Sequence, residues 1–327
     1  MINNIQALRA FAALNVVFYH IIGASISYDL PATSFLFLKE WGQNGVDIFF
    51  VISGFIMVFI QEKNRKSSFE FIKNRVERIV PVYWLLTLAY ISLAFIIPSA
   101  FNSLNISSSK IIYSFLFIED WMSKEMPLLY VGWTLEYEML FYIIFSLSLI
   151  IKNKIFSYFT MSIAFVLLPL VTSLDLIILE FAFGMLCAFV FLRFNPKNGM
   201  LIAGFGFLFL CSSIFFDYEI HRFMKWGIPA FFIVLGLLWM RQTQNKLVIY
   251  LGNASYSIYL IQVFTIPFFY KISFQYLIFL DGHIIAILAL IFSAVIGCLF
   301  YQIVEVKVTH FFKAYKSNSL LKSSAPA

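Results

Sequence analysis

Long apolar segments follow one another along the whole chain, with short polar stretches between them. A membrane-spanning helix needs about 20 mostly apolar residues, and strands of an outer-membrane barrel would instead alternate apolar and polar positions. The pattern therefore predicts ten transmembrane helices, at residues 6–27, 44–62, 79–98, 134–151, 155–173, 175–193, 199–216, 226–241, 247–270 and 283–304.

Two segments fall outside these spans. The apolar piece "IIYSFLFIEDW" at 111–121 is shorter than a span, so we expect it to re-enter the membrane or lie at the outer surface. The polar end "SNSLLKSSAPA" is typical of disorder. The prediction is one membrane domain over 1–310 and a disordered cytoplasmic tail over 311–327, because no stretch is left for a soluble domain.

Composition and charge support an all-α, polytopic membrane protein. The chain is 61% hydrophobic and 12% charged, far from the balance of a soluble domain. With both termini cytoplasmic, 17 of the 23 Lys and Arg residues fall on the inner side, as the positive-inside rule requires. The six on the outer side are Lys39, Lys110, Lys124, Arg222, Lys225 and Lys271.

Two function classes are disfavoured by the same counts. The net charge of +6 is spread through short cytoplasmic loops, which gives no nucleic-acid-binding patch. The three cysteines, Cys187, Cys211 and Cys298, lie within apolar runs without the spacing of a disulfide or metal site. We expect neither a nucleic-acid partner nor a metal.

The first span carries two ionisable residues, Arg9 and His20. Their 11-residue separation places them on one helix face, about 16.5 Å apart along the axis. Arg9 lies near the cytoplasmic end and His20 roughly 10 Å below the outer end. Each has a simple alternative role, since an arginine can anchor the helix at the interface and a histidine can hydrogen-bond a neighbouring helix.

Several polar residues lie at the same depth as His20. Asp47, Ser53, Glu138 and Glu180 are predicted roughly 4 to 14 Å below the outer surface. Ionisable groups inside a membrane are costly and mark functional sites. A histidine beside carboxylates is suited to proton transfer, so the layer predicts a polar cavity open to the outer side.

The cytoplasmic loop "QEKNRKSSFEFIKNRVERIVPVYW" carries a second kind of chemistry. Arg75 and Arg78 are three residues apart, so a helix would present both guanidinium groups on one face. Such a pair is suited to phosphate oxygens. The alternative is a topology anchor, which any cytoplasmic loop supplies without a ligand.

Seven blocks of sequence occur in order over about residues 2 to 307: "IQALRAFAALNVVFYH", "NGVDIFFVISGFIM", "FIKNRVERIVPVYW", "WTLEYEMLFY", "LEFAFGM", "YLGNASYSIYL" and "IVEVK". In this order they resemble the membrane acyltransferase family (acyltransferase type 3) that O-acylates bacterial surface polysaccharides. The likeness is nearest to members that O-acetylate exopolysaccharide or O-antigen sugars.

The resemblance implies a cytoplasmic acyl-CoA donor, acetyl-CoA in the nearest members, and a carbohydrate acceptor, free or lipid-linked, at the outer face of the bacterial inner membrane. The family's arginine and histidine of the first span match Arg9 and His20, and its paired arginines match Arg75 and Arg78. Its acid in the fourth span falls on Glu138. Asp47 and Ser53 match its second block. Gln262 stands where many members have a histidine, so the proton transfer is expected to fall on His20.

These observations combine into one mechanistic hypothesis. The donor phosphates bind Arg75 and Arg78 with Arg9 nearby, and the pantetheine arm runs along the first helix toward His20. His20 is the general base for a sugar hydroxyl that attacks the thioester. Glu138 or Asp47 orients the imidazole. A covalent acyl-histidine intermediate is equally compatible with the spacing.

Further residues have weaker assignments. Ser53 and backbone amides could bind the oxyanion. Trp133, Tyr137 and Tyr142 could stack on sugar rings, although aromatic residues at that depth commonly form the interfacial belt. Glu180 is the remaining candidate at the acceptor side.

Two other functions are compatible with buried charges. A transporter or flippase could use His20 and the carboxylates as a proton relay, but its inverted repeat is not evident. A non-catalytic scaffold would leave the clustered charges without a purpose.

Overall fold

The computed structural model describes residues 2–98, 106–172, 174–216 and 219–312. All regular elements of this described part are helical. They are α1 (Asn3–Ser27), η1 (Thr33–Leu38), η2 (Glu40–Gln43), α2 (Asn44–Lys63), α3 (Ser68–Ile96), α4 (Ser108–Leu116), α5 (Glu119–Ser123), η4 (Tyr130–Gly132), α6 (Trp133–Ser148), α7 (Lys154–Val171), η5 (Leu176–Ile178), α8 (Leu179–Arg193), α9 (Gly199–Phe215), η6 (Phe223–Gly227), α10 (Ile228–Trp239), α11 (Lys246–Asn253), α12 (Ser255–Tyr276), α13 (Gly282–Phe300) and η7 (Tyr301–Glu305).

The all-α, multi-pass character is confirmed. Over the described ranges, seven helical segments are long and apolar enough to cross a membrane, those containing α1, α2, α3, α7, α8, α12 and α13. Two further apolar segments, Gly199–Phe215 and Phe223–Trp239, are shorter. The predicted fourth span corresponds to α6, of 16 residues. The count of ten spans therefore remains a prediction.

Large apolar side chains on the surface of these helices fit a lipid environment. Phe95 in α3, Leu170 in α7 and Leu208 in α9 are each more than 70% exposed. Such exposure would promote aggregation in water, whereas in a bilayer it faces acyl chains.

Three predicted boundaries need correction. The span drawn over 247–270 is broken at Ala254, so that α11 is a short separate helix and α12 continues to Tyr276. The third helix begins at Ser68 rather than at residue 79, because Ser67 caps it by accepting a hydrogen bond from Glu70 N. The piece at 111–121 forms two short helices, α4 and α5.

The described chain ends in a helix that continues from α13 through η7 to Phe312. Nearly all of the tail that was predicted over 311–327 lies outside the described residues.

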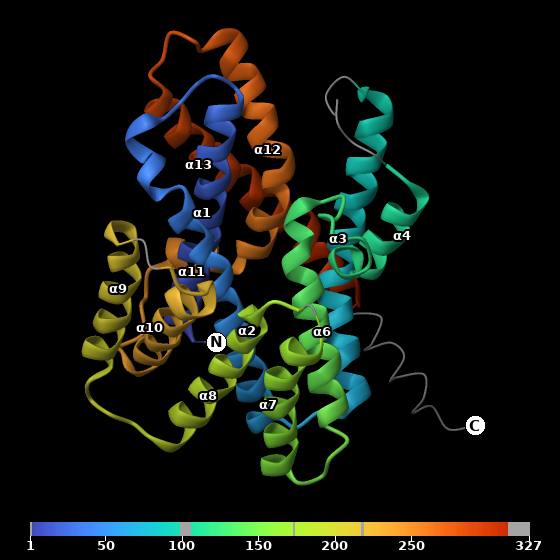
Figure 1. Ribbon diagram of the computed structural model, residues 1–327, viewed down its shortest axis with the longest axis vertical. Helices are drawn as coiled ribbons and strands as arrows, with labels where there is room; N and C mark the ends of the chain where they lie inside the picture. The colour runs from blue at the N-terminus through green and yellow to red at the C-terminus, as the bar shows by residue number, and fades with distance from the viewer. Residues whose placement is uncertain (1, 99–105, 173, 217–218, 313–327) are drawn as a thin grey trace.

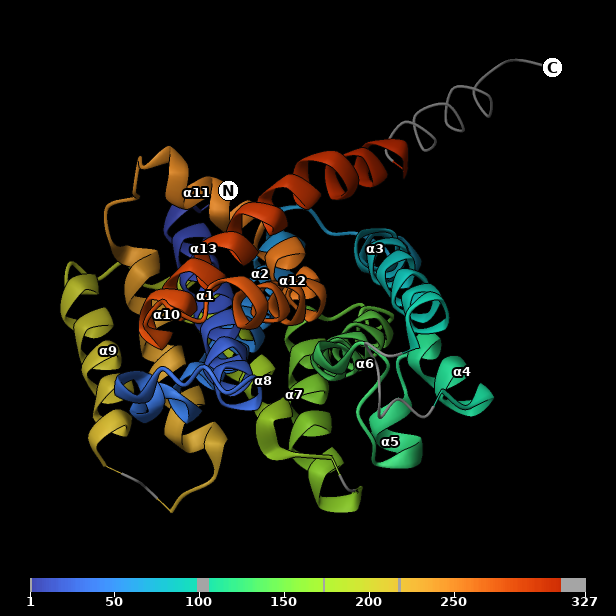
Figure 2. The ribbon, with the colours of Figure 1, turned by 90° about the horizontal axis from the view of Figure 1, so that it is seen from above.

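The helices form two blocks (Figures 1 and 2). The larger block contains α1, α2 and α8–α13. Its most closely packed pairs of helices are α9 with α10, α2 with α8, and α12 with α13. The smaller block contains α3–α7, with α6 packed between α3 and α7. Fewer contacts join the blocks, through α2 with α6, α3 with α12 and α7 with α8.

Glycines allow the tightest crossing, between α2 and α8. A Cβ atom on Gly54 would lie 2.1 Å from the carbonyl oxygen of Phe181, and one on Gly184 would lie 2.0 Å from that of Val51. Small residues at such crossings let membrane helices approach closely. This crossing fixes α2, which carries several of the candidate site residues.

We expect Gly54→Ala or Gly184→Ala to destabilise the protein by about 1–3 kcal/mol each, because the added methyl group would push the two backbones apart. Thermal unfolding of the purified protein in detergent measures this effect. Gly204→Ala in α9 is the matched control, since a Cβ atom there meets nothing within 4 Å. This control should stabilise the protein slightly, by up to about 1 kcal/mol. Equal melting temperatures for all three variants would contradict the close-crossing explanation.

Candidate functional site

A cavity lies between the two blocks, and its empty space, the open solvent at its mouth included, is about 790 Å³. Five helices line it: α1, α2, α3, α6 and α12. The lining residues are Arg9, Val46, Phe49, Phe50, Ile52, Ser53, Ile56, Met57, Arg75, Arg78, Ile79, Thr134, Leu135, Glu138, Tyr142, Ser255, Tyr256 and Tyr259.

Three arginines from two helices meet in this cavity. Arg9 comes from α1, while Arg75 and Arg78 lie one turn apart on α3. Arg9 is 8% exposed, and its Nη1 donates to Gln6 Oε1 at 3.3 Å. Arg75 Nε is buried without a hydrogen-bond partner among the described residues. Since buried donors are normally satisfied, this cluster is suited to receive an anion.

Glu138 lies in the same cavity as the arginines. Its Oε1 accepts hydrogen bonds from Ser53 Oγ, at 2.8 Å, and from the Tyr142 hydroxyl. The two hydroxyls also lie 3.4 Å from each other. Glu138 thus balances part of the positive charge, but three guanidinium groups still outnumber the one carboxylate that lines the cavity.

The rest of the lining is apolar or carries hydroxyl groups. Along α2 it extends from Met57 outward to Val46, a distance of about 16.5 Å for 11 residues of helix. Thr134 and Tyr259 lie at this outer half, and both hydroxyls are within hydrogen-bond distance of the Val131 carbonyl oxygen, at 3.1 and 2.9 Å. The cavity is therefore an elongated space with a cationic end near Met57 and an uncharged end near Val46, which are its inner and outer ends in the predicted topology.

His20 lies beside the outer end of this cavity but does not line it. The imidazole is half-buried and contacts two aromatic rings, with centroid distances of 4.7 Å to Tyr19 and 4.8 Å to Tyr130. Tyr130 directly precedes Val131, whose carbonyl group binds the cavity hydroxyls. In this conformation Tyr130, on η4, connects the histidine to the cavity.

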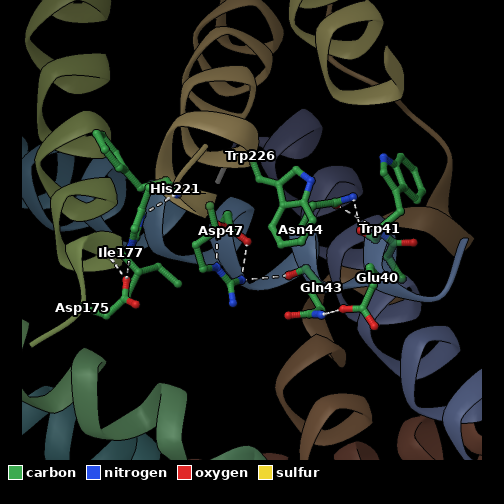
Figure 3. Close-up of polar contacts among 12 residues, drawn as sticks. Glu40, Trp41, Gln43, Asn44, Asp47, Asp175, Ile177, His221 and Trp226 are labelled. Atoms are coloured by element: carbon green, nitrogen blue, oxygen red, sulfur yellow. Dashed lines mark hydrogen bonds and ion pairs between the residues drawn. The ribbon is translucent and has the colours of Figure 1, made fainter. Parts of the chain in front are cut away.

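Asp47 does not lie with His20, contrary to the expectation that it orients the imidazole. It is fully buried and accepts two hydrogen bonds from Arg222, from Nη2 at 2.7 Å and from Nε at 3.3 Å (Figure 3). The guanidinium group also lies over the rings of Trp226 and Trp133, 5.2 and 5.9 Å from their centroids. Sequence reasoning missed this pair because it treated Arg222 as one of the outer loop cations.

Glu180 belongs to this second cluster. It is fully buried beside Asp47, and its Oε1 lies 2.8 Å from the position that a Cβ atom on Gly227 would occupy. Neither carboxyl oxygen makes a hydrogen bond of ordinary geometry with the described residues. This cluster, formed by Asp47, Glu180 and Arg222, joins α2, α8 and the residues around η6. We call it the clamp, because its geometry is that of a structural link between these elements.

Two predicted aromatic residues also have internal partners. Trp133 packs edge-on against Tyr137, with 6.0 Å between centroids, as well as over Arg222. The Tyr137 hydroxyl accepts a hydrogen bond from Asp175 N at 3.2 Å. Both side chains are therefore held by contacts within the protein, and neither ring is available solely for stacking on a sugar.

The position at which many family members have a histidine is buried. Gln262 Nε2 donates to the Tyr259 carbonyl oxygen at 2.8 Å, and its Oε1 has no partner among the described residues. Gln262 therefore supports the helix turn that carries Tyr259, and lies outside the cavity lining.

No group of three or more His, Cys, Asp or Glu side chains in the described part of the chain is arranged to hold a metal ion. The polar groups of the cavity are guanidinium, hydroxyl and one carboxylate. This donor set is suited to an anionic ligand rather than to a cation.

Comparison with known proteins agrees with the order of the sequence blocks. The family model described as an acyltransferase domain matches residues 2–302. Over 121 residues the chain is 40% identical to the exopolysaccharide production protein ExoZ of Rhizobium meliloti (strain 1021). This match covers 35% of the chain and 36% of that relative, so it spans about a third of each protein. No solved structure matches the chain.

Proposed function

Because this chain belongs to the acyltransferase domain family over residues 2–302, we propose that it transfers an acetyl group from cytoplasmic acetyl-CoA to a carbohydrate hydroxyl at the outer face of the bacterial inner membrane. The name of the relative, which places it in exopolysaccharide production, supports a polysaccharide as the acceptor. The observation that carries the proposal is the elongated cavity with Arg9, Arg75 and Arg78 at one end.

The form of the cavity fits an acyl-CoA. The phosphates of the donor bind the arginine end, where charge-assisted hydrogen bonds to guanidinium groups are strong. The pantetheine arm extends from the arginine end into the uncharged half between α2, α6 and α12. The whole lining along α2, about 16.5 Å, is comparable in length to the extended arm. The arm therefore follows α2 rather than α1, which revises the path expected from sequence.

His20 is the proposed general base. It accepts the proton of the sugar hydroxyl, and the resulting alkoxide forms a C–O bond to the thioester carbonyl carbon. The C–S bond then breaks, and the proton passes from His20 to the leaving CoA thiolate. For this step the acyl group has to pass the residues at the outer end of the cavity, Val131, Thr134 and Tyr259, and reach the far side of Tyr130.

The carboxylates have other proposed roles. Glu138 is one counter-charge of the arginine cluster, beside Glu305, which interacts with Arg9 and Arg78. Ser53 and Tyr142 hold Glu138 there through their hydroxyl groups. We therefore assign Ser53 and Tyr142 to the donor cavity instead of to the oxyanion or the sugar. Asp47 and Glu180 maintain the packing of α2 against α8, which positions one wall of the cavity.

Arg78→Ala tests the donor site. In proteoliposomes with radiolabelled acetyl-CoA and acceptor glycan, wild type should move label into the glycan. We expect the variant to raise the donor KM about 10–100-fold with little change in kcat, since it loses hydrogen bonds to a charged group.

Arg193→Ala is the matched control, because Arg193 is an exposed arginine at the inner end of α8 and does not line the cavity. An unchanged donor KM in Arg78→Ala, or an equal rise in Arg193→Ala, would contradict a specific phosphate site. If wild type binds acetyl-CoA but transfers no label to any of the glycans tested, the proposal of a carbohydrate acceptor would be contradicted.

A further inference from the structure

The inner wall of the cavity includes the start of α12, at Ser255 and Tyr256. Ser255 is fully buried, lines the cavity, and its hydroxyl has no hydrogen-bond partner among the described residues. A buried hydroxyl without a partner costs free energy, and Ser255 differs from the equally buried Ser273 in lining the cavity, so its hydroxyl is available to a group that a ligand supplies.

The other three hydroxyls of the segment "SYSIY" are occupied. The Tyr256 hydroxyl donates to the Ile79 carbonyl oxygen at 2.9 Å, and Ser257 Oγ donates to Glu305 Oε2 at 2.5 Å. The Tyr259 hydroxyl lies 2.9 Å from the Val131 carbonyl oxygen. These bonds join α12 to α3, η7 and η4 and hold the helix start rigidly, which leaves Ser255 as the hydroxyl available to a ligand.

Backbone geometry adds to the attraction for an anion. α12 is 22 residues long and begins at Ser255, after the break at Ala254. The first N–H groups of a helix have no acceptor within the helix, and its dipole places partial positive charge at this end. Helix N-termini bind phosphate groups for these reasons.

The break in the helix also places this N-terminus beside Arg9. Gly252 lies against the backbone of Gln6, where a Cβ atom would be 2.0 Å from the carbonyl oxygen, so the residue here has to be small. The side chain of Gln6 accepts the hydrogen bond from Arg9. On the opposite side, the acceptor of the Tyr256 hydroxyl is the residue that follows Arg78. Ser255 therefore lines the same cavity as Arg9 and Arg78, at a helix start whose neighbouring residues contact the segments that carry both arginines.

We propose that the start of α12 is a phosphate subsite, in which Ser255 Oγ and the first N–H groups of α12 bind one phosphoryl group of the donor beside Arg9 and Arg78. This inference rests on the proposed function only for the identity of the donor. The subsite itself recognises the chemistry of a phosphate group. It assigns a binding role to a residue that lies far in sequence from the arginines.

Ser255→Ala tests the subsite by equilibrium binding to the full-length protein in lipid nanodiscs. The probes are CoA, dephospho-CoA, which lacks the 3′-phosphate, pantetheine, which has no phosphate, and pyrophosphate. We expect affinity for CoA and pyrophosphate to fall about tenfold, the effect of one lost hydrogen bond to a charged group, and affinity for pantetheine to stay unchanged. If the loss is absent for dephospho-CoA, the phosphoryl group bound is the 3′-phosphate.

Ser273→Ala is the matched control, because Ser273 is also fully buried on α12 with an unpartnered hydroxyl, but does not line the cavity. It should leave all four affinities within twofold of the wild-type values, and both variants should unfold at or above the wild-type temperature, because each loses a buried hydroxyl without a partner. Unchanged CoA and pyrophosphate binding in Ser255→Ala, or an equal loss for pantetheine, would overturn the proposal. If wild type binds pyrophosphate through Ser255 but acetyl-CoA transfers no label, the subsite stands and the proposed function fails.

Discussion

His20→Ala is expected to lower acetyl transfer about 10²–10⁴-fold at saturating donor and acceptor, and to leave the affinity for CoA within about twofold. The first effect is the usual contribution of a general base. The second follows from geometry, because His20 contacts Tyr19 and Tyr130 and does not line the cavity in which the donor is proposed to bind. Transfer of label from acetyl-CoA to glycan and equilibrium binding of CoA measure the two quantities separately.

His310→Gln is the control for this experiment, since His310 is exposed at the far end of the helix that continues from α13. It should retain wild-type transfer. Transfer that survives in His20→Ala would show that the histidine is a packed polar residue and that the base lies elsewhere. Label that accumulates on wild-type protein without acceptor, but not on His20→Ala, would identify an acyl-histidine intermediate instead of direct transfer.

Asp47→Asn is expected to destabilise the folded protein by about 3–5 kcal/mol, because it leaves Arg222 without its buried partner. Asp47 is fully buried and binds Arg222 through both oxygens, so the carboxylate is a structural group in this conformation. Thermal unfolding in detergent measures the loss. The specific activity of the fraction that remains folded should fall less than tenfold.

A double variant that removes the charges of both Asp47 and Arg222 distinguishes this structural role from a catalytic one. The variant Asp47→Asn with Arg222→Gln should recover part of the lost stability, because Arg222 is no longer left without its partner, although the Glu180 carboxyl remains in the cluster. A double variant that is no more stable than Asp47→Asn alone would argue against the clamp. If Asp47→Asn keeps its melting temperature and loses transfer 10²-fold or more, Asp47 would be a catalytic residue after all.

The apolar segments were predictable because the membrane imposes one requirement on every span. The break at Ala254 was not predicted, since no proline or charged residue marks it, and the close packing of Gly252 on Gln6 next to it depends on the tertiary structure. The early start of α3 had a readable signal, the serine and glutamate at 67 and 70 that form a cap, but the surrounding positive charges favoured a loop.

The candidate site was only partly predictable, for a geometric reason. Position along a helix predicts the depth of a residue, and the prediction that Asp47, Glu138 and His20 lie at similar depths rests on this alone. Depth does not say toward which neighbouring helix a side chain points. Glu138 faces the arginines and Asp47 faces Arg222, and both directions depend on how α2 and α6 are rotated against their neighbours.

Arg9 and the α3 pair were assigned together by the family motifs, and the structure brings them into one cavity. Ser255 lies in the motif "YLGNASYSIYL", but no role was assigned to it from the sequence. A serine just after an Asn-Ala pair gives no sign of being buried, and its missing partner is visible only when the surrounding hydroxyls are accounted for.

The cavity lies between two blocks and not inside one, so a change in its width would require the blocks to shift but no helix to unfold. The bonds across the boundary include those of the Tyr256 and Tyr259 hydroxyls to backbone carbonyl groups of α3 and η4, of Ser53 to Glu138, and of Lys154 and Tyr158 to Glu62. The neutral bonds among them contribute only about 1 kcal/mol each. The glycine-packed crossing of α2 and α8 stays intact when these bonds break. Movements of packed helices of this kind take microseconds to milliseconds, which is fast enough to admit a donor on every cycle and slow enough to limit turnover.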